Sequence, residues 1–134
     1  MYFNHDPNLV SVLDGGLKKW LKEKREITND IKIFKKSSYL AGENKSLVLN
    51  KDQIDANIKN KSFELIDARS RERFLGLQPE ARKELKSGNI KDSKNMPFTE
   101  LINSNDHTFK KKDELISIFE KNKINPNKKI AFSC

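Results

Sequence analysis

Short apolar runs alternate with stretches of helical spacing along the chain. Runs rich in branched and aromatic residues are typical of buried strands, and they predict strands over residues 9–13, 46–49, 62–67 and 129–134. Apolar side chains three or four positions apart predict helices that begin near Leu17, follow Asn50 and occupy 113–122, with short helical turns at 71–74 and 97–102. Because helices separate the strands, we predict an α/β fold with a largely parallel sheet flanked by helices.

Two stretches follow neither pattern. Residues 27–42 mix polar and apolar positions and include a Lys-Lys-Ser-Ser run, which is typical of a linker. This linker divides the chain into a strand–turn–helix unit, residues 1–26, and a longer unit, residues 43–134. Residues 76–89 are predicted to form a long loop because they carry a proline and two glycines.

Composition narrows the partners that we expect. The 134 residues include 27 basic and 19 acidic side chains, a formal net charge of +8. The lysines occur in short scattered runs, whereas a nucleic-acid site needs basic residues on one face with aromatic residues among them. We therefore expect no nucleic-acid partner, although the positive field attracts small anions.

No apolar stretch approaches a membrane span and the start lacks a secretion signal. A single cysteine excludes an internal disulfide. We expect a cytoplasmic protein without a membrane partner.

Chemically useful residues follow two of the predicted strands. One strand runs into Asp67-Ala-Arg69, and the last one runs into the only cysteine, Cys134. Ligands of open α/β sheets bind beyond the carboxyl ends of the strands. If these two strands are parallel neighbours, Asp67, Arg69 and Cys134 meet at one edge of the sheet.

Two further arginines can reach the same edge. Arg73 follows Arg69 by four residues on a helical turn, and Arg82 lies on the long loop. Nearby arginines favour the thiolate form of a cysteine, and their planar forks match carboxylates and sulfur oxyanions. This pattern predicts attack on, or transfer from, a small anion.

Structural interpretations of the same residues stay open. A lone cysteine at a strand end can be a buried, inert residue, Asp-x-Arg can be a cap with an ion pair, and Arg73 can belong to a solvated helix face. The sequence has no cysteine and histidine cluster for a metal, no Gly-rich phosphate loop and no G-x-S-x-G motif. We predict no metal site.

An ordered series of motifs resembles one family. The segments are FELIDARSRERF (63–74), GLQPEAR (76–82), SGNI (87–90), NMPF (95–98) and the final Ser-Cys pair. Together they resemble the second domain of the tandem rhodanese-type sulfurtransferases, in the branch of the thiosulfate and 3-mercaptopyruvate sulfurtransferases. The opening VSVLDGGLKKW (10–20) resembles the end of the first domain.

The resemblance implies a fold and a set of roles. The fold would be rhodanese-like and incomplete at both ends, with 1–26 as the end of a first domain, 27–42 as the interdomain linker and 43–134 as the start of the second, catalytic domain. Cys134 would carry sulfur as a persulfide, from thiosulfate or 3-mercaptopyruvate to a thiol or cyanide, without a cofactor. Arg73 and Arg82 would bind the donor anion, Arg82 through the mercaptopyruvate carboxylate, while Asp67 and Arg69 would support the wall of the site.

The chain also departs from the family pattern. The family has histidine where this chain has Asn89, and a Pro-Gly turn where it has Lys91-Asp92. The family's cysteine begins a loop of backbone N–H donors, which this sequence does not contain. We therefore expect the 134-residue chain by itself to be inactive and marginally stable. Two alternatives remain: a non-catalytic rhodanese module with a binding or regulatory role, and a cysteine phosphatase on the related fold.

Overall fold

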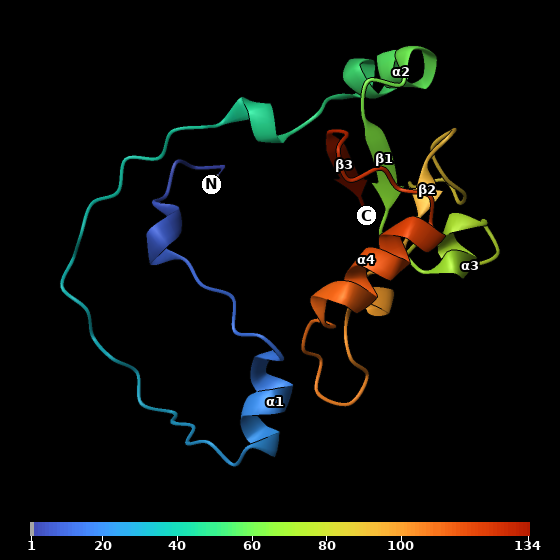
Figure 1. The fold of residues 1–134 in the computed structure, drawn as a ribbon. Coiled ribbons are helices and arrows are strands. Elements are labelled where there is room, and N and C mark those ends of the chain that lie inside the picture. Colours follow the sequence, from blue (N-terminus) through green and yellow to red (C-terminus); the bar gives the residue numbers. More distant parts are fainter. Residues whose placement is uncertain (1) are drawn as a thin grey trace.

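A small parallel sheet forms the centre of the molecule. The computed structural model describes residues 2–134, and its sheet has the order β2-β1-β3 (Figure 1). The strands are β1 (Glu64–Asp67), β2 (Lys94–Asn95) and β3 (Ile130–Ser133). The central strand β1 pairs in parallel with both neighbours. The predicted α/β fold with a parallel sheet is confirmed.

The helices lie close to their predicted positions. They are α1 (Gly16–Lys22), α2 (Lys51–Asn60), α3 (Arg71–Phe74) and α4 (Lys112–Lys121). Asn50 begins α2 with a capping box: its side chain accepts from the backbone N–H of Gln53, and the Gln53 side chain accepts from the backbone N–H of Asn50. The predicted helical turn at 97–102 is the 3-10 helix η3 (Phe98–Leu101).

Two predicted strands are wrong. The 9–13 segment follows the 3-10 helix η1 (Pro7–Leu9), and the 46–49 segment overlaps the 3-10 helix η2 (Lys45–Leu47). Asp6 and Asn44 cap these turns by accepting backbone N–H groups two residues later. Neither segment joins the sheet in residues 2–134. Local capping prevails over strand propensity where the turns form, and residues 10–13 find no strand to pair with.

The core lies on the face of the sheet that α4 covers. Ile66, Met96 and Ile124 are buried there. Partly buried apolar side chains from η3, α4 and β3 pack against them, namely Leu101, Ile118, Phe119 and Ile130. This cluster holds β1 and β3 at fixed positions, and the residues that follow these strands are held with them.

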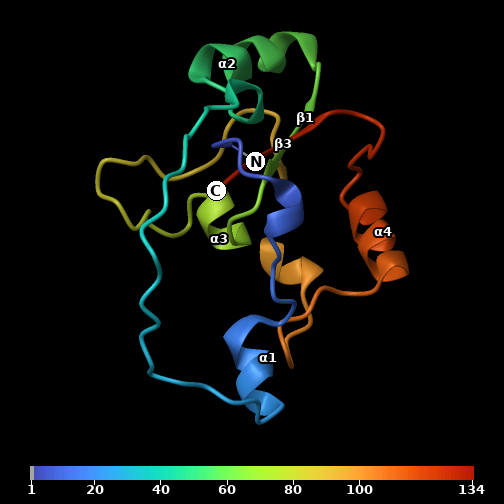
Figure 2. The same cartoon turned by 90° about the vertical axis from the view of Figure 1, so that its left-hand side faces the viewer.

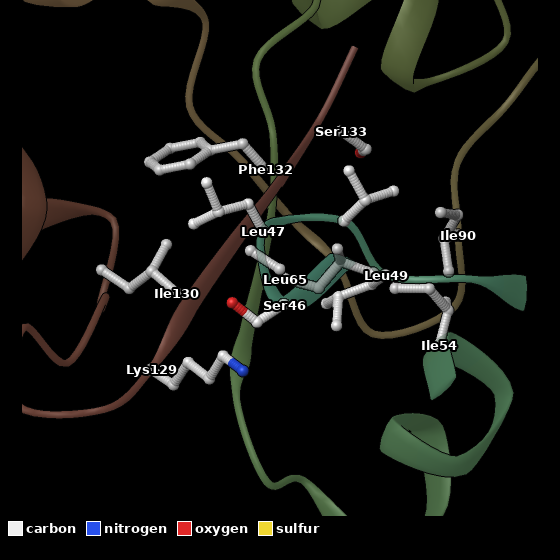
Figure 3. A pocket seen from close by; sticks show the side chains of 12 residues that line it. Ser46, Leu47, Leu49, Ile54, Leu65, Ile90, Lys129, Ile130, Phe132 and Ser133 are labelled. Atoms are coloured by element: carbon white, nitrogen blue, oxygen red, sulfur yellow. The ribbon is translucent and has the colours of Figure 1, made fainter. Parts of the chain in front are cut away.

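The opposite face of the sheet borders a hollow. An apolar cavity of about 560 Å³ lies between β1, β3 and the segment from η2 to α2. Its lining includes Leu47, Leu49, Ile54 and Leu65 (Figure 3). Phe132 and Ser133 point to opposite sides of β3 in that view. Leu65 is nevertheless buried, with 5% of its surface exposed, so this face is covered at β1 and hollow beside β3.

The first part of the chain forms a wide arc outside this unit (Figure 1). Residues 25–44 contain no helix or strand, in agreement with the predicted irregular stretch. The arc touches the rest of the chain through the loop at 103–109, beside α1 (Figure 2). Asp14 Oδ1 accepts from the Phe109 N–H at 2.9 Å, and Lys18 Nζ lies 3.3 Å from the Ser104 carbonyl oxygen. The division into domains stays a prediction. None of the helices within residues 2–134 has the length and apolar character that a bilayer crossing requires.

Candidate active site

The parallel pairing of β1 with β3 brings two strand ends together. Asp67 is the register partner of Ser133, and the Ala68 N–H donates to the Ser133 carbonyl at 2.9 Å. Cys134 comes next in the chain and is exposed. The strands are thus parallel neighbours, and Asp67 and Cys134 lie at the same edge of the sheet, as we predicted.

Asp67 is a buried carboxylate held by Arg69. Only 1% of Asp67 is exposed. The Arg69 guanidinium donates to both carboxylate oxygens, with Nη2 at 2.6 Å and Nε at 3.0 and 3.1 Å, and the Arg69 backbone N–H donates at 3.0 Å. Burial alone would raise the pKa of Asp67, but the hydrogen bonds and charge of Arg69 outweigh it and hold that pKa below its ordinary value.

Arg69 is almost fully engaged within the protein. Besides Asp67, it donates through Nη1 to Glu80 at 2.6 Å and through Nη2 to the Gly88 carbonyl at 2.7 Å. A guanidinium has five N–H donors, so at most one is left for a ligand. The cap-and-ion-pair interpretation of Asp-x-Arg therefore describes the observed geometry, and Arg69 fits a supporting position.

Glu80 is the member of this network that sequence reasoning missed. It lies on the long loop, yet only 2% of its side chain is exposed. One carboxylate oxygen accepts from Arg69 and the other accepts from Arg73 Nη2 at 2.5 Å. The hydrogen bond from Arg73 is the main reason why the pKa of Glu80 lies below its ordinary value. The available signal was an acidic residue within the Arg-rich motif series.

Arg73 keeps donors that no group within residues 2–134 uses. It lies in α3, whose N-cap Ser70 accepts the Arg73 backbone N–H at 3.4 Å. About a third of its side chain, 36%, is exposed, and its Nε is buried without a hydrogen-bond partner in residues 2–134. A single Nη2 donor binds Glu80. The geometry therefore leaves Arg73 able to offer several N–H groups to an anion.

Arg82 and Cys134 stand apart from this network. Arg82 is exposed on the loop, and its side chain makes no hydrogen bond or ion pair with residues 2–134. Within the described part of the chain, no such interaction joins Cys134 to Arg73 or Arg82 either. The structure thus joins Asp67, Arg69 and Arg73 through Glu80, and does not bring Arg82 to them.

An apolar pocket borders the thiol. Its volume is about 440 Å³, and Ala68, Ser133 and Cys134 form the wall at the strand ends. The remaining lining is apolar and comes from the residue after β2, from η3 and from the following loop, namely Met96, Phe98, Leu101, Ile102 and Phe109, with Phe132 of β3. Sequence patterns did not identify this pocket. Across residues 2–134, no three His, Cys, Asp or Glu side chains gather as metal ligands.

The amino-acid sequence is similar to those of known sulfurtransferases. The chain is 36% identical over 126 residues to the thiosulfate sulfurtransferase of Bos taurus, covering 93% of this chain and 42% of that enzyme. It is 31% identical over 125 residues to the 3-mercaptopyruvate sulfurtransferase of Mus musculus, with the same coverage. The chain therefore spans less than half the length of these relatives. No protein-family model matches it.

The backbone agrees with a solved structure of the same kind. The crystal structure of SseA from Escherichia coli, described as a 3-mercaptopyruvate sulfotransferase with the rhodanese fold, superposes with a TM-score of 0.77 at 27% identity. The match covers 92% of this chain and 45% of SseA. The predicted rhodanese-like fold is confirmed.

Proposed function

Since the chain is homologous over most of its length to part of the thiosulfate and 3-mercaptopyruvate sulfurtransferases, we propose that the protein transfers sulfur from a small anionic donor through Cys134. The acceptor is a thiol or cyanide. The observation that carries this proposal is the position of Cys134, at the strand end beside Asp67 and the arginine network that Asp67 begins. We propose that the reaction requires no cofactor and that the protein is cytoplasmic.

The proposed reaction has two steps, transfer of sulfur to Cys134 and transfer from Cys134 to the acceptor. The Cys134 thiolate attacks the transferable sulfur of the donor, and the bond from that sulfur to the rest of the donor breaks. Sulfite leaves from thiosulfate, or the pyruvate enolate leaves from 3-mercaptopyruvate and takes up a proton. The acceptor then attacks the outer sulfur of the persulfide, and the Cys134 thiolate is regenerated.

The arginines supply the anion-binding part of the proposal. Arg73 has free donors and a fixed position, so it binds the charged end of the donor. Arg82 is exposed and unengaged within residues 2–134, so it is available to a carboxylate. We therefore favour 3-mercaptopyruvate over thiosulfate as the donor.

The test is formation of thiocyanate from cyanide by the purified protein, with each donor in turn. Cys134→Ser abolishes transfer from both donors. Arg82→Ala raises the KM for 3-mercaptopyruvate more than the KM for thiosulfate, whereas Arg71→Ala, at an exposed arginine of α3, serves as the matched control. A wild-type protein that prefers thiosulfate strongly refutes the donor preference. Hydrolysis of an aryl phosphate without sulfur transfer refutes the function.

The activity of residues 1–134 by themselves is a separate question. Cys134 is exposed, and the thiolate is the reactive form of a cysteine, which nearby cations or N–H donors must stabilise. No Arg73 or Arg82 contact reaches the thiol within residues 2–134. We propose that this polypeptide alone does not turn over. Thiocyanate formation by purified residues 1–134, lost in Cys134→Ala, contradicts that proposal.

A further inference from the structure

A buried carboxylate on a surface loop requires an explanation. Glu80 has only 2% of its side chain exposed, although the loop residues on either side of it, Pro79 and Ala81, are exposed. Removing a carboxylate from water is costly unless charged partners and hydrogen bonds compensate for it. Both compensations are present, because each oxygen of Glu80 accepts from a different arginine.

Glu80 joins two parts of the candidate site that would otherwise be separate. Arg69 is fixed to the end of β1 through Asp67, whereas Arg73 belongs to α3. Oε1 of Glu80 lies 2.6 Å from Arg69 Nη1, and Oε2 lies 2.5 Å from Arg73 Nη2. No other ion pair within residues 2–134 holds the Arg73 side chain. The orientation of the Arg73 guanidinium therefore depends on Glu80.

The use of donors separates the roles of the two arginines. Arg69 bonds to Asp67, Glu80 and the Gly88 carbonyl, which uses nearly all of its N–H groups. Arg73 donates one N–H to Glu80, and its other side-chain N–H groups have no hydrogen-bond partner within residues 2–134. Its side chain is 36% exposed. Glu80 thus restrains Arg73 without saturating it.

From this geometry we propose that Glu80 is a positioning residue, which orients Arg73 to bind the anionic sulfur donor. This inference rests on the proposed sulfur transfer and adds to it the residue that sets donor binding. Glu80 does not contact the donor or the thiol. It acts through Arg73, so its loss affects the binding of the donor more than the transfer of sulfur.

Charge alone makes the opposite prediction. Asp67, Arg69, Glu80 and Arg73 together carry two negative and two positive charges, so neutralising Glu80 leaves this group with a net positive charge. If Glu80 acted only as a counter-charge, its removal would strengthen anion binding and lower the KM for the donor. If Glu80 positions Arg73, its removal raises that KM.

The experiment compares Glu80→Gln with the wild-type protein in the cyanide assay, with 3-mercaptopyruvate and thiosulfate as donors. For residues 1–134 by themselves, for which we propose no turnover, calorimetry measures the Kd for thiosulfate, and we expect the same changes in that Kd as in the KM. The glutamine side chain keeps the shape of the carboxylate but turns an N–H₂ group toward one arginine. We expect the KM for the donor to rise about tenfold, with kcat and the KM for cyanide changed less than about twofold. Glu80→Asp keeps the charge with a shorter reach, so its KM lies between the two. Glu84→Gln, at an exposed position of the same loop, is the matched control and leaves all constants unchanged.

Each outcome decides between the explanations. An unchanged or lowered KM in Glu80→Gln overturns the proposal, and so does a fall in kcat with the KM unchanged. If neither the Glu80→Gln nor the Glu80→Asp variant folds, as judged by circular dichroism, Glu80 has a structural role only and the proposal is again wrong. A wild-type protein that neither transfers sulfur nor binds thiosulfate by calorimetry refutes the proposed function itself, and the role of Glu80 fails with it.

Discussion

Replacing Asn57 tests how the chain passes from α2 to the central strand. Asn57 is buried, with 6% of its surface exposed, and its side chain makes three hydrogen bonds. Its Nδ2 donates to the Phe63 carbonyl at 3.1 Å, and its Oδ1 accepts from the Phe63 N–H at 2.9 Å and from the Ser62 hydroxyl at 3.2 Å. Asn57→Ala removes all three and leaves both backbone groups of Phe63 without these partners.

The magnitude follows from two opposing effects. Loss of the hydrogen bonds to the two backbone groups of the half-buried Phe63 lowers the free energy of unfolding by about 1 to 1.5 kcal/mol each. The exposed Ser62 hydroxyl instead bonds to water at little cost. Alanine in a helix interior is about 0.6 kcal/mol more favourable than asparagine, which raises the free energy of unfolding by that amount. The net loss in free energy of unfolding is about 2 kcal/mol, because the two lost backbone partners outweigh the gain in helix propensity.

Urea unfolding followed by circular dichroism measures this loss. With a slope of about 2 kcal/mol per molar urea, the midpoint falls by about 1 M. Asn60→Ala is the control, since Asn60 is exposed at the end of the same helix and its side chain accepts only the Ser62 N–H within residues 2–134. Its cost is below about 0.5 kcal/mol. Equal midpoints for the two variants would refute the reasoning that the buried connection stabilises the fold.

Three further predictions use the same measurement. Asn50→Ala breaks the capping box of α2 and lowers the free energy of unfolding by about 1 kcal/mol, whereas Asn50→Ser keeps most of it. Ile66→Ala empties the fully buried position on β1 and costs about 3 kcal/mol; a cost below about 1 kcal/mol contradicts the assigned core. The folded-state pKa values of Asp67 and Glu80 lie below their ordinary values of 3.8 and 4.5. The two ionised carboxylates therefore stabilise the fold fully above the ordinary pKa values, and this stabilisation is lost as the pH falls through the lowered folded-state pKa values. Wild-type midpoints therefore fall with acidification below about pH 4.5, and Glu80→Gln falls less steeply.

The sequence predicts those elements whose signals are local. Asn50 and the helical spacing after it predict α2, and the run before Asp67 predicts β1 because it is apolar and branched. In contrast, β2 consists of Lys94 and Asn95, which carry no apolar signal and form a strand only because β1 offers its free edge. The strand expected at 9–13 is wrong for the converse reason: its branched residues have no strand to pair with in residues 2–134.

The candidate site also has a part that the sequence predicts and a part that it does not. Parallel pairing brings the end of β1 to the end of β3, and this could be predicted from strand order and topology alone. The position of Glu80 could not be predicted, because it depends on how a loop folds back over eleven residues to reach Arg69. The exposed position of Arg82 depends on the same loop. Side chains on long loops are placed by tertiary contacts, which local patterns do not record.

The Arg69 guanidinium also closes the loop that carries Arg82. One of its nitrogens binds Glu80 and another binds the Gly88 carbonyl, so the two ends of residues 81–87 meet at a single side chain. The entropy of closing such a loop grows slowly with its length. Residues can therefore be inserted into or deleted from 81–87 at a small cost in stability. A change beside Arg82 moves that side chain, while the bond from Arg73 to Glu80 lies outside the altered segment. A change of donor preference can thus arise through loop length, without any substitution at the strand ends that hold the thiol.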